Sequence, residues 1–187
     1  GYDILFFWVA RMILMSTYLL GEIPFKTVYL HGLVRDSQGR KISKSLGNNV
    51  EPLDMIAKYG SDAVRMSLII GTGPGNDSKM SEDKLKAYRN FANKLWNITR
   101  FILTECEGVI FDPHFKSSEA DKKIHDWACD FTNEITKEMD EYKLHIVAEK
   151  LYAFTWHKLA DEILEESKTI FASGDAHAIA SRKNLLV

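Results

Sequence analysis

The sequence predicts a mainly α-helical chain that opens with part of an α/β unit and continues as an antiparallel bundle of helices. Three observations support this fold class. In the first fifty residues, a segment with helical spacing precedes a β-branched and aromatic segment and then a loop. Residues 71–77 contain four Gly or Pro in seven positions, which marks a boundary. Beyond that boundary we find no strand pattern, only amphipathic helices.

Before the boundary, the apolar segment 4–20 is the first predicted element. It carries Arg11 in its middle and Ser16 near its end, so it is too short and too polar for a membrane span. We therefore expect a buried helix that ends at Gly21. The other elements expected here are a strand over 27–31, a helix from Pro52 to about Lys58, and a helix from Ser61 to about Gly71.

After the boundary, hydroxyl residues mark the starts of helices. Ser81 should cap a long helix, and Ser118 should cap a second one with Asp121 three residues later. A third long helix should end at Gly174, and 176–187 should open a fourth. The apolar face expected on the first of these helices consists of Leu85, Tyr88, Ala92, Leu95, Thr99, Ile102 and Leu103.

Composition excludes some classes of protein. The chain has 187 residues, of which 45% are hydrophobic, enough for a packed core rather than disorder. A net charge of −2 gives no general attraction to nucleic acid or membrane, so any polyanion contact must be local. Cys106 and Cys129 lack metal-ligand spacing, so we expect two free buried thiols and no structural metal. We find no signal peptide and expect a cytoplasmic chain that is a segment of a longer protein.

Such a local patch lies at residues 35–48, which we call the signature loop. From Lys26 to position 50 there are five Lys or Arg and one acid. Lys41 and Lys44 can each bring an ammonium to a phosphate, and Ser43 and Ser45 add donors. The structural alternative is a solvated basic hairpin tip.

The order Lys-Ile-Ser-Lys-Ser at 41–45 resembles the Lys-Met-Ser-Lys-Ser loop of class I aminoacyl-tRNA synthetases, with Ile42 where Met is usual. The resemblance implies that this loop closes over ATP. It implies that Lys44, supported by Lys41, stabilises charge on the phosphates during adenylate formation, and that Ser43 and Ser45 bind the nucleotide. Positioned cations are the usual means of stabilising such transition states.

The first residues, Gly-Tyr-Asp-Ile-Leu-Phe-Phe-Trp, resemble the valine-specific members of the same family. The resemblance implies that Gly1 and Asp3 bind the ribose of the adenylate and that Ile4 and Trp8 line the amino-acid pocket. An aspartate can accept hydrogen bonds from two adjacent hydroxyls. The structural alternative makes Asp3 an N-cap and Trp8 a core residue.

A second segment, His31-Gly32-Leu33-Val34-Arg35-Asp36, is also similar to the valine-specific members. There the backbone beside the glycine faces adenine, which implies that its first four residues belong to the ATP and adenylate site. For His31 alone, a structural histidine is the simpler interpretation.

A polar stripe follows one face of the predicted helix after Ser81. Its members on this face are Lys86, Asn90, Asn93, Asn97 and Arg100, and the adjacent Arg89 is counted with them as a sixth candidate. Asn is a poor helix former, so three on one stripe need a reason. Contact with tRNA is one, because such side chains dominate contacts with nucleic acid. A buried polar network that joins the helix to the preceding domain is the other, and the sequence leaves both open.

The resemblance implies two domains. Residues 1–75 would be the second half of a Rossmann-type catalytic domain with the stem-contact region, and 76–187 an α-helical anticodon-binding domain. It implies a monomer that uses valine, ATP with Mg²⁺, and valine-accepting tRNA, with no membrane partner. The His-Ile-Gly-His signature and an editing domain are absent from these 187 residues, so we expect the isolated chain to be inactive. The alternatives are an isoleucine- or leucine-specific member, or a non-catalytic tRNA-binding helical module.

Overall fold

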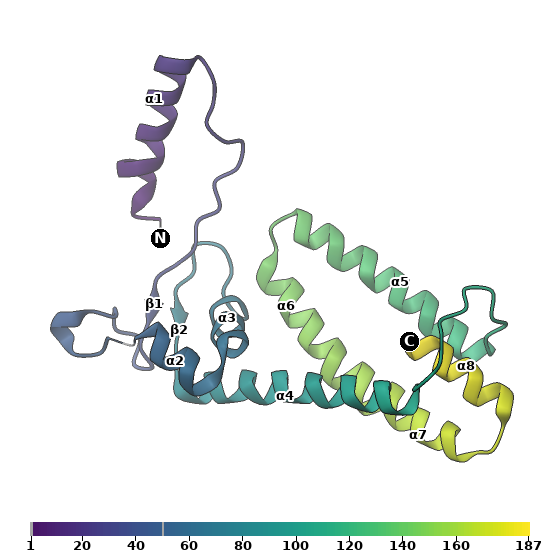
Figure 1. The fold of residues 1–187 in the computed structure, drawn as a ribbon. Helices are drawn as coiled ribbons and strands as arrows, with labels where there is room; N and C mark the ends of the chain where they lie inside the picture. Colours follow the sequence, from purple (N-terminus) through teal and green to yellow (C-terminus); the bar gives the residue numbers. More distant parts are fainter. Residues whose placement is uncertain (1, 50) are drawn as a thin grey trace.

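The computed structural model describes residues 2–49 and 51–187. It is mostly helical and holds a two-stranded parallel sheet, so the prediction of a mainly α-helical chain is confirmed. Figure 1 shows the first helix standing apart at one end, short helices beside the sheet, and long helices filling the other end.

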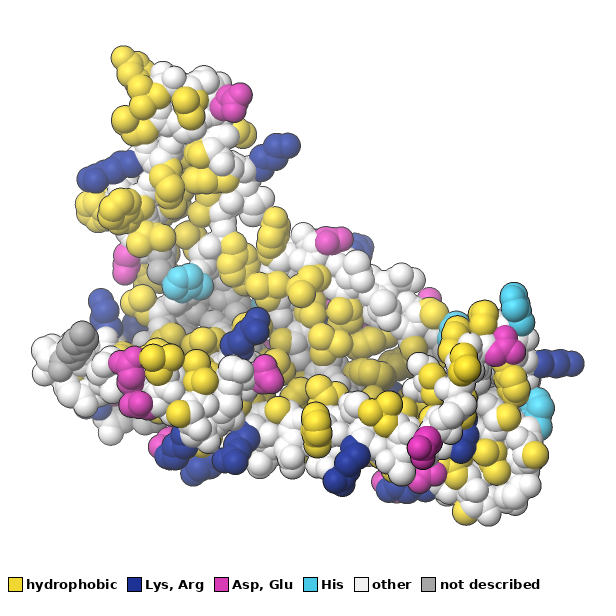
Figure 2. Space-filling model, viewed as in Figure 1, with side chains coloured by type: hydrophobic (Ala, Val, Ile, Leu, Met, Phe, Trp, Pro, Cys, Tyr) yellow, Lys and Arg dark blue, Asp and Glu magenta, His cyan; other side chains and the backbone are white. Residues whose placement is uncertain are grey.

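The first helix begins with a π-helical turn, Leu5–Val9, and continues as α1 (Ala10–Leu20). Gly21 ends it as predicted, with a φ of 72°. The expectation that this helix is buried was wrong for the described chain, since Tyr18 is 85% exposed and Phe6 77% exposed. None of the other described helices covers α1 (Figure 1), and hydrophobic side chains gather over its surface (Figure 2).

The sheet lies slightly later in the chain than predicted. Strand β1 (Val34–Arg35) pairs in parallel with β2 (Ser78–Lys79), with Val34 opposite Ser78. Residues 27–31 form no strand, and a strand after the boundary was not expected, so both predictions were wrong. The physical reason is strand pairing. Among the described residues, segment 27–31 receives one backbone hydrogen bond from another segment, from Gly75 N to Leu30 O at 2.9 Å. One such bond is too few for a β-ladder.

The two short helices that follow are confirmed. Helix α2 (Pro52–Tyr59) starts at Pro52, and α3 (Ser61–Ile69) follows it after Gly60. A buried cluster of Tyr59, Ala63, Val64 and Leu85 joins them to the next long helix.

Helix α4 (Glu82–Glu105) starts at Ser81, whose Oγ accepts a hydrogen bond from Lys84 N at 3.2 Å. Leu85 is fully buried, but Leu103 is 69% exposed and Leu95 is 45% exposed, so the predicted apolar face was wrong in its second half. The reason is a change of neighbour along α4. Helix α3 covers its first half, whereas Ile98 in its second half packs with Ala160 and Leu164.

The remaining helices also match the predicted starts and ends. They are α5 (Glu119–Asp140), α6 (Leu144–Ala153), a π-helical stretch Phe154–Leu164, α7 (Glu165–Ala172) and α8 (Ala176–Leu186). Helices α5 and α6 run side by side in opposite directions, α8 packs on α5 and α7, and α4 crosses the π-helical stretch (Figure 1).

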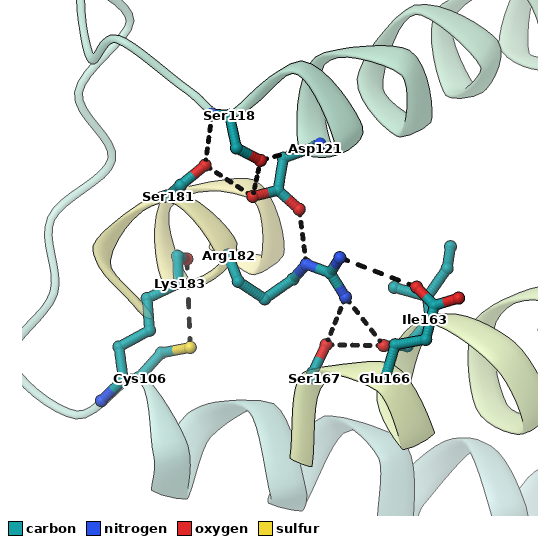
Figure 3. A network of polar contacts seen from close by, with 9 residues as sticks. All are labelled: Cys106, Ser118, Asp121, Ile163, Glu166, Ser167, Ser181, Arg182 and Lys183. Atoms are coloured by element: carbon teal, nitrogen blue, oxygen red, sulfur yellow. Dashed lines mark hydrogen bonds and ion pairs between the residues drawn. The ribbon is translucent and has the colours of Figure 1, made fainter. Parts of the chain in front are cut away.

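Helix α8 is held by a buried polar network (Figure 3). Arg182, 1% exposed, donates from Nε to Asp121 Oδ1 at 2.6 Å and from Nη1 to Ser167 Oγ at 3.0 Å. Asp121 is 2% exposed and also accepts from Ser181 Oγ. A buried charge is stable only when paired, so this network ties α5, α7 and α8 together.

The two cysteines differ. Cys106 is buried and free, as expected, and burial raises the pKa of its thiol. Cys129 is free but exposed, because it shares a face of α5 with the exposed His125 four residues earlier. The expectation of two buried thiols was therefore wrong for Cys129.

Candidate functional site

The signature loop begins as a tight turn next to the sheet. Asp36 N donates to Arg40 O at 3.0 Å, and Gly39 N donates to Asp36 O at 2.9 Å. Gly39 has a φ of 82°, which a glycine adopts without strain. Arg35 and Lys41 then form an antiparallel bridge, and a 3₁₀ turn spans Lys44–Leu46. The loop projects sideways from the molecule (Figure 1).

Two side chains that sequence reasoning missed hold this loop. Asp36 Oδ1 accepts from Gln38 N at 3.0 Å and from Arg40 N at 2.8 Å, while its Oδ2 accepts from Asn48 Nδ2 at 3.0 Å. Asn48 also accepts from Ser43 N at 2.9 Å. Asx side chains in tight turns commonly bond nearby backbone, so Asp36 before Gly39 was a readable signal for half of this arrangement.

The cations of the loop divide into two groups. The guanidinium of Arg35 pairs with Asp77, and that of Arg40 pairs with Asp36 at 2.8 Å. Lys41 is exposed, and its ammonium pairs with no acid in the part of the chain that the structure describes. The two arginines therefore shape the site, and Lys41 is left available to a ligand.

The acids in these pairs have shifted pKa values. The hydrogen bond from Asn48, with those from Arg40, lowers the pKa of Asp36 from 3.8 to about 2. The hydrogen bond from Leu33 N and the guanidinium of Arg35 lower the pKa of Asp77. Both carboxylates are therefore ionised at neutral pH.

Residues 71–77, predicted only as a boundary, form a wall of the site. Leu33 N donates to Asp77 Oδ1 at 2.7 Å, so the carboxylate holds the backbone of the segment 31–34. Gly32 is buried, and a Cβ at this position would lie 1.9 Å from the carbonyl oxygen of Asn76. Only a glycine permits this approach of the two backbones.

The same segment touches the helical end of the molecule. Gly71 N donates to Glu149 Oε1 of α6 at 3.1 Å, and a Cβ on Gly73 would lie 3.5 Å from His145 Nε2. Residues 71–77 therefore contact segment 31–34 on one side and α6 on the other.

The residues predicted at the start of the chain are displayed on its surface. Asp3 is exposed, and Ile4 rather than Asp3 is the N-cap residue, with no side-chain capping bond. Trp8 is 60% exposed, so neither the N-cap nor the core alternative describes this structure. Gly1 lies outside the described residues. Within those residues, no hydrogen bond or ion pair joins Asp3, Ile4 or Trp8 to the signature loop.

The structure does bring together the segment 31–34, the signature loop and residues 71–77. His31 is exposed, with Nδ1 2.8 Å from Gly32 O. Ser43 Oγ and Ser45 Oγ lie 2.7 Å apart and share a hydrogen bond. The signature loop therefore offers hydroxyls and the exposed Lys41 beside the backbone of these neighbouring segments, groups that suit a phosphate-bearing ligand.

The polar stripe of α4 lies at the surface. All six members are exposed, and Lys86, Arg89, Asn90 and Asn93 line one open depression of about 430 Å³. Asn97 Nδ2 donates to Asn93 O at 2.9 Å, within the same helix. Arg89 donates to Lys58 O of α2 across 3.5 Å. Lys and Arg side chains follow the edge of the molecule that α4 forms (Figure 2).

A larger apolar cavity was not predicted. It has a volume of about 530 Å³, lies between α3 and α4, and contains none of the predicted site residues. Its presence follows from the exposed apolar residues of α4, since Leu95 and Trp96 form part of its lining.

Among the described residues, no group of three or more His, Cys, Asp or Glu side chains could hold a metal ion. None of the described helices combines the length and hydropathy that a membrane crossing requires.

Comparison with known families assigns the class. Residues 1–81 match the family described as tRNA synthetases class I (I, L, M and V), and residues 121–186 match the anticodon-binding domain of tRNA ligase. The valine–tRNA ligase of Clostridium acetobutylicum is 44% identical over 189 residues, covering 100% of this chain and 22% of that protein. That of Pelagibacter ubique is 46% identical over 180 residues, covering 95% of this chain and 21% of that protein.

The chain therefore belongs to the class I tRNA synthetases of the isoleucine, leucine, methionine and valine group. Within this group, the relatives that match 95–100% of its length are named valine–tRNA ligases. The chain spans about a fifth of the length of the curated relatives it matches.

Solved structures show the same fold. A Mycobacterium tuberculosis methionyl-tRNA synthetase in complex with methionyl-adenylate matches with a TM-score of 0.75 at 24% identity, covering 99% of this chain and 37% of that one. An Agrobacterium radiobacter LeuRS in a ternary complex with tRNA and LeuAMS matches with a TM-score of 0.72 at 20% identity, covering 94% of this chain and 22% of that one.

Proposed function

We propose that this chain supplies part of the adenylate site and part of the tRNA-binding surface of a ligase. That enzyme joins valine to ATP as valyl-adenylate with release of pyrophosphate, and then transfers valine to tRNA. The observation that carries the proposal is the signature loop, in which the exposed Lys41 and the paired hydroxyls of Ser43 and Ser45 are held in a frame of polar bonds. Relatives named valine–tRNA ligase support the choice of amino acid over the isoleucine, leucine and non-catalytic alternatives.

Lys44 is the proposed catalytic residue, and Lys41 its support. Adenylate formation breaks the bond between the α- and β-phosphates of ATP while the valine carboxylate bonds to the α-phosphate. Negative charge grows on the departing pyrophosphate, and a positioned ammonium stabilises it most in the transition state. Mg²⁺ would enter with ATP as part of the substrate and share in neutralising the phosphates.

The nucleoside end of the adenylate would meet the segment 31–34 and the start of the chain. The backbone of 31–34, bonded to Asp77 and packed closely on Asn76 at Gly32, gives a fixed edge for a flat base. Asp3 would accept from the ribose hydroxyls, together with Gly1. Ile4 and Trp8 would contact the valine side chain, as their exposure permits.

Two domains are part of the proposal. Residues 1–75 would complete the Rossmann-type catalytic domain and its stem-contact region, and residues 76–187 would form most of the anticodon-binding domain. The match of 121–186 to an anticodon-binding family supports the second. We expect the enzyme to be a cytoplasmic monomer.

The test of the catalytic role uses the full-length ligase that contains this segment. Lys44→Ala should lower kcat for valine-dependent ATP–pyrophosphate exchange by about 10²–10³-fold, as for the loss of one oxyanion-hole donor, with little change in KM for valine. An unchanged kcat would make Lys44 a surface residue. The isolated 187-residue chain should show no exchange, and a rate near that of the intact enzyme would contradict the proposal.

The polar stripe of α4 is the proposed tRNA contact. Its exposure supports this over a buried network, and from Lys79 to Arg100 there are six basic residues and two acids. Phosphate contacts release counterions, so binding should weaken steeply as salt rises. In a filter-binding titration of valine-accepting tRNA at two salt concentrations, Lys86→Glu with Arg100→Glu should reduce affinity. Asp126→Lys with Asp130→Lys on the acidic α5 is the matched control. If the Lys86/Arg100 variant binds tRNA as tightly as this control at both salt concentrations, the stripe lies against protein.

A further inference from the structure

We propose that Asn48 is a positioning residue for valine activation, which acts with Asp36 to set the shape of the signature loop. We call the two side chains the Asp36–Asn48 clasp. The inference rests on the proposed function, because it concerns how Lys41 and Lys44 reach the phosphates. It assigns a role to two side chains for which the resemblance described above implies none.

The amide of Asn48 bonds three separate points of the loop. Its Oδ1 accepts from Ser43 N at 2.9 Å. Its Nδ2 donates to Lys41 O at 3.1 Å and to Asp36 Oδ2 at 3.0 Å. The first two bonds hold the backbone on both sides of Ile42, directly between the two proposed lysines.

Asp36 anchors the other end of the clasp. Its Oδ1 accepts from two backbone N–H groups, and its backbone N–H donates to Arg40 O at 3.0 Å. Asp36 directly follows β1, which is paired with β2. A continuous series of contacts therefore runs from the sheet to Asp36, from Asp36 to Asn48, and from Asn48 to the backbone of Lys41 and Ser43.

Only an amide satisfies this geometry. Asn48 must accept from one N–H while it donates to a carbonyl and to a carboxylate. An aspartate would lose both donors and place a second carboxylate about 3 Å from Asp36. These three hydrogen bonds are consistent with the half-buried side chain of Asn48, whereas the side chain of the neighbouring Asn49 is exposed.

This arrangement matters for rate because charge stabilisation depends on the placement of the cation. A lysine stem has many rotamers, so the backbone from which it starts must be fixed if its ammonium is to meet the pyrophosphate in the transition state. Partners that orient a directly acting group typically change activity by about 10–100-fold, as outer-shell residues of metal sites do.

The experiment is a double-mutant cycle in the full-length ligase, measured by valine-dependent ATP–pyrophosphate exchange. Asn48→Ala and Asn48→Asp should each lower kcat by about 10–100-fold and leave KM for valine nearly unchanged. In the Lys44→Ala background, Asn48→Ala should cost less than about 3-fold, because the group that it positions is gone. Asn49→Ala is the matched control and should keep kcat within about 2-fold.

Each other outcome overturns the inference. Equal losses of kcat in the unaltered and the Lys44→Ala enzymes would show that Asn48 acts through protein stability or through another group. If stability is the cause, the thermal unfolding temperature would also fall in both enzymes. A rise in KM for valine with an unchanged kcat would make it a binding residue. If Lys44→Ala itself has no effect, the proposed function has failed as well, whereas a slow Lys44→Ala enzyme with a normal Asn48→Ala enzyme rejects the positioning role alone.

Discussion

At the scale of single residues, the site depends on polar side chains that bond backbone. Asp36, Asn48 and Asp77 between them accept from or donate to five backbone groups in or next to the signature loop and segment 31–34. Bonds to ionised acceptors are about twice as strong as neutral ones, so these few residues can fix a loop that buries little apolar surface.

The first prediction concerns the pKa of Asp36, which lies at about 2. A carboxyl whose pKa is lowered by folding stabilises the folded loop above its ordinary pKa of 3.8, and that contribution disappears as pH falls through about 2. An NMR titration of the Asp36 carboxyl should show it mostly ionised at about pH 3. Asn48→Ala should raise the midpoint, while Asn49→Ala should not, and an ordinary midpoint in the unaltered chain would contradict the clasp.

A second prediction concerns Gly32. An alanine Cβ would lie 1.9 Å from Asn76 O, so the backbones of 31–34 and 71–77 must separate. We expect Gly32→Ala to lower the free energy of unfolding of this chain by about 1–3 kcal/mol, the range for overpacking. Ser37→Ala, at an exposed position in the loop, is the control and should change it little. Equal thermal unfolding midpoints for the two variants would disprove the close approach.

At the scale of elements, helix α4 shows how neighbours decide which residues are buried. The sequence places Leu85 and Leu103 on one apolar face, yet Leu85 is 0% exposed and Leu103 is 69% exposed. Helices α2 and α3 surround the start of α4, whereas its last turns have no such cover among the described residues. Apolar periodicity shows which face could be buried, and packing decides how much of it is.

The third prediction uses this pair of leucines. Leu85→Ala removes side-chain contacts with Tyr59, Ala63 and Val64, and should cost about 2–5 kcal/mol of unfolding free energy. Leu103→Ala removes the same atoms from an exposed site and should change it by less than about 0.5 kcal/mol. Urea unfolding followed by circular dichroism would measure both, and similar losses would mean that the end of α4 is covered in solution.

At the scale of the whole molecule, two sets of contacts between residues far apart in the sequence join its parts. Residues 71–77 contact α6 through Glu149, and they also contact the candidate adenylate segment. The Asp121–Arg182 network fixes the last helix to α5 and α7. The loop that sequence reasoning treated as a simple boundary therefore helps join the sheet end to the helical end, together with the packing of α3 on α4 and α6.

The fourth prediction tests the buried ion pair. Arg182→Met leaves the Asp121 carboxylate buried without its partner and should cost about 3–5 kcal/mol of unfolding free energy. Lys168→Met, which breaks an exposed pair with Glu165 at 2.6 Å, should cost less than about 1 kcal/mol. Asp121→Asn together with Arg182→Met should recover part of the loss, and a loss as small as that of Lys168→Met would mean that solvent reaches the pair.

The sequence alone determined the features that depend only on residues close together in the chain. Ser81 and Ser118 start helices because their hydroxyls accept the first free N–H groups, and Gly21 ends one because it adopts a positive φ. The order of residues 41–45 was sufficient to indicate the family, because a loop of two lysines and two hydroxyls is readable without its neighbours.

Tertiary structure decided everything that depends on a partner distant in the chain. Residues 34–35 pair with residues 78–79 in the sheet, and Leu33 N donates to Asp77, 44 positions later in the chain. Neither contact leaves a local pattern in the sequence. The exposure of α1 and of the end of α4 likewise depends on which segments lie against them. Burial and pairing are properties of two surfaces in contact, and a sequence pattern describes only one of them.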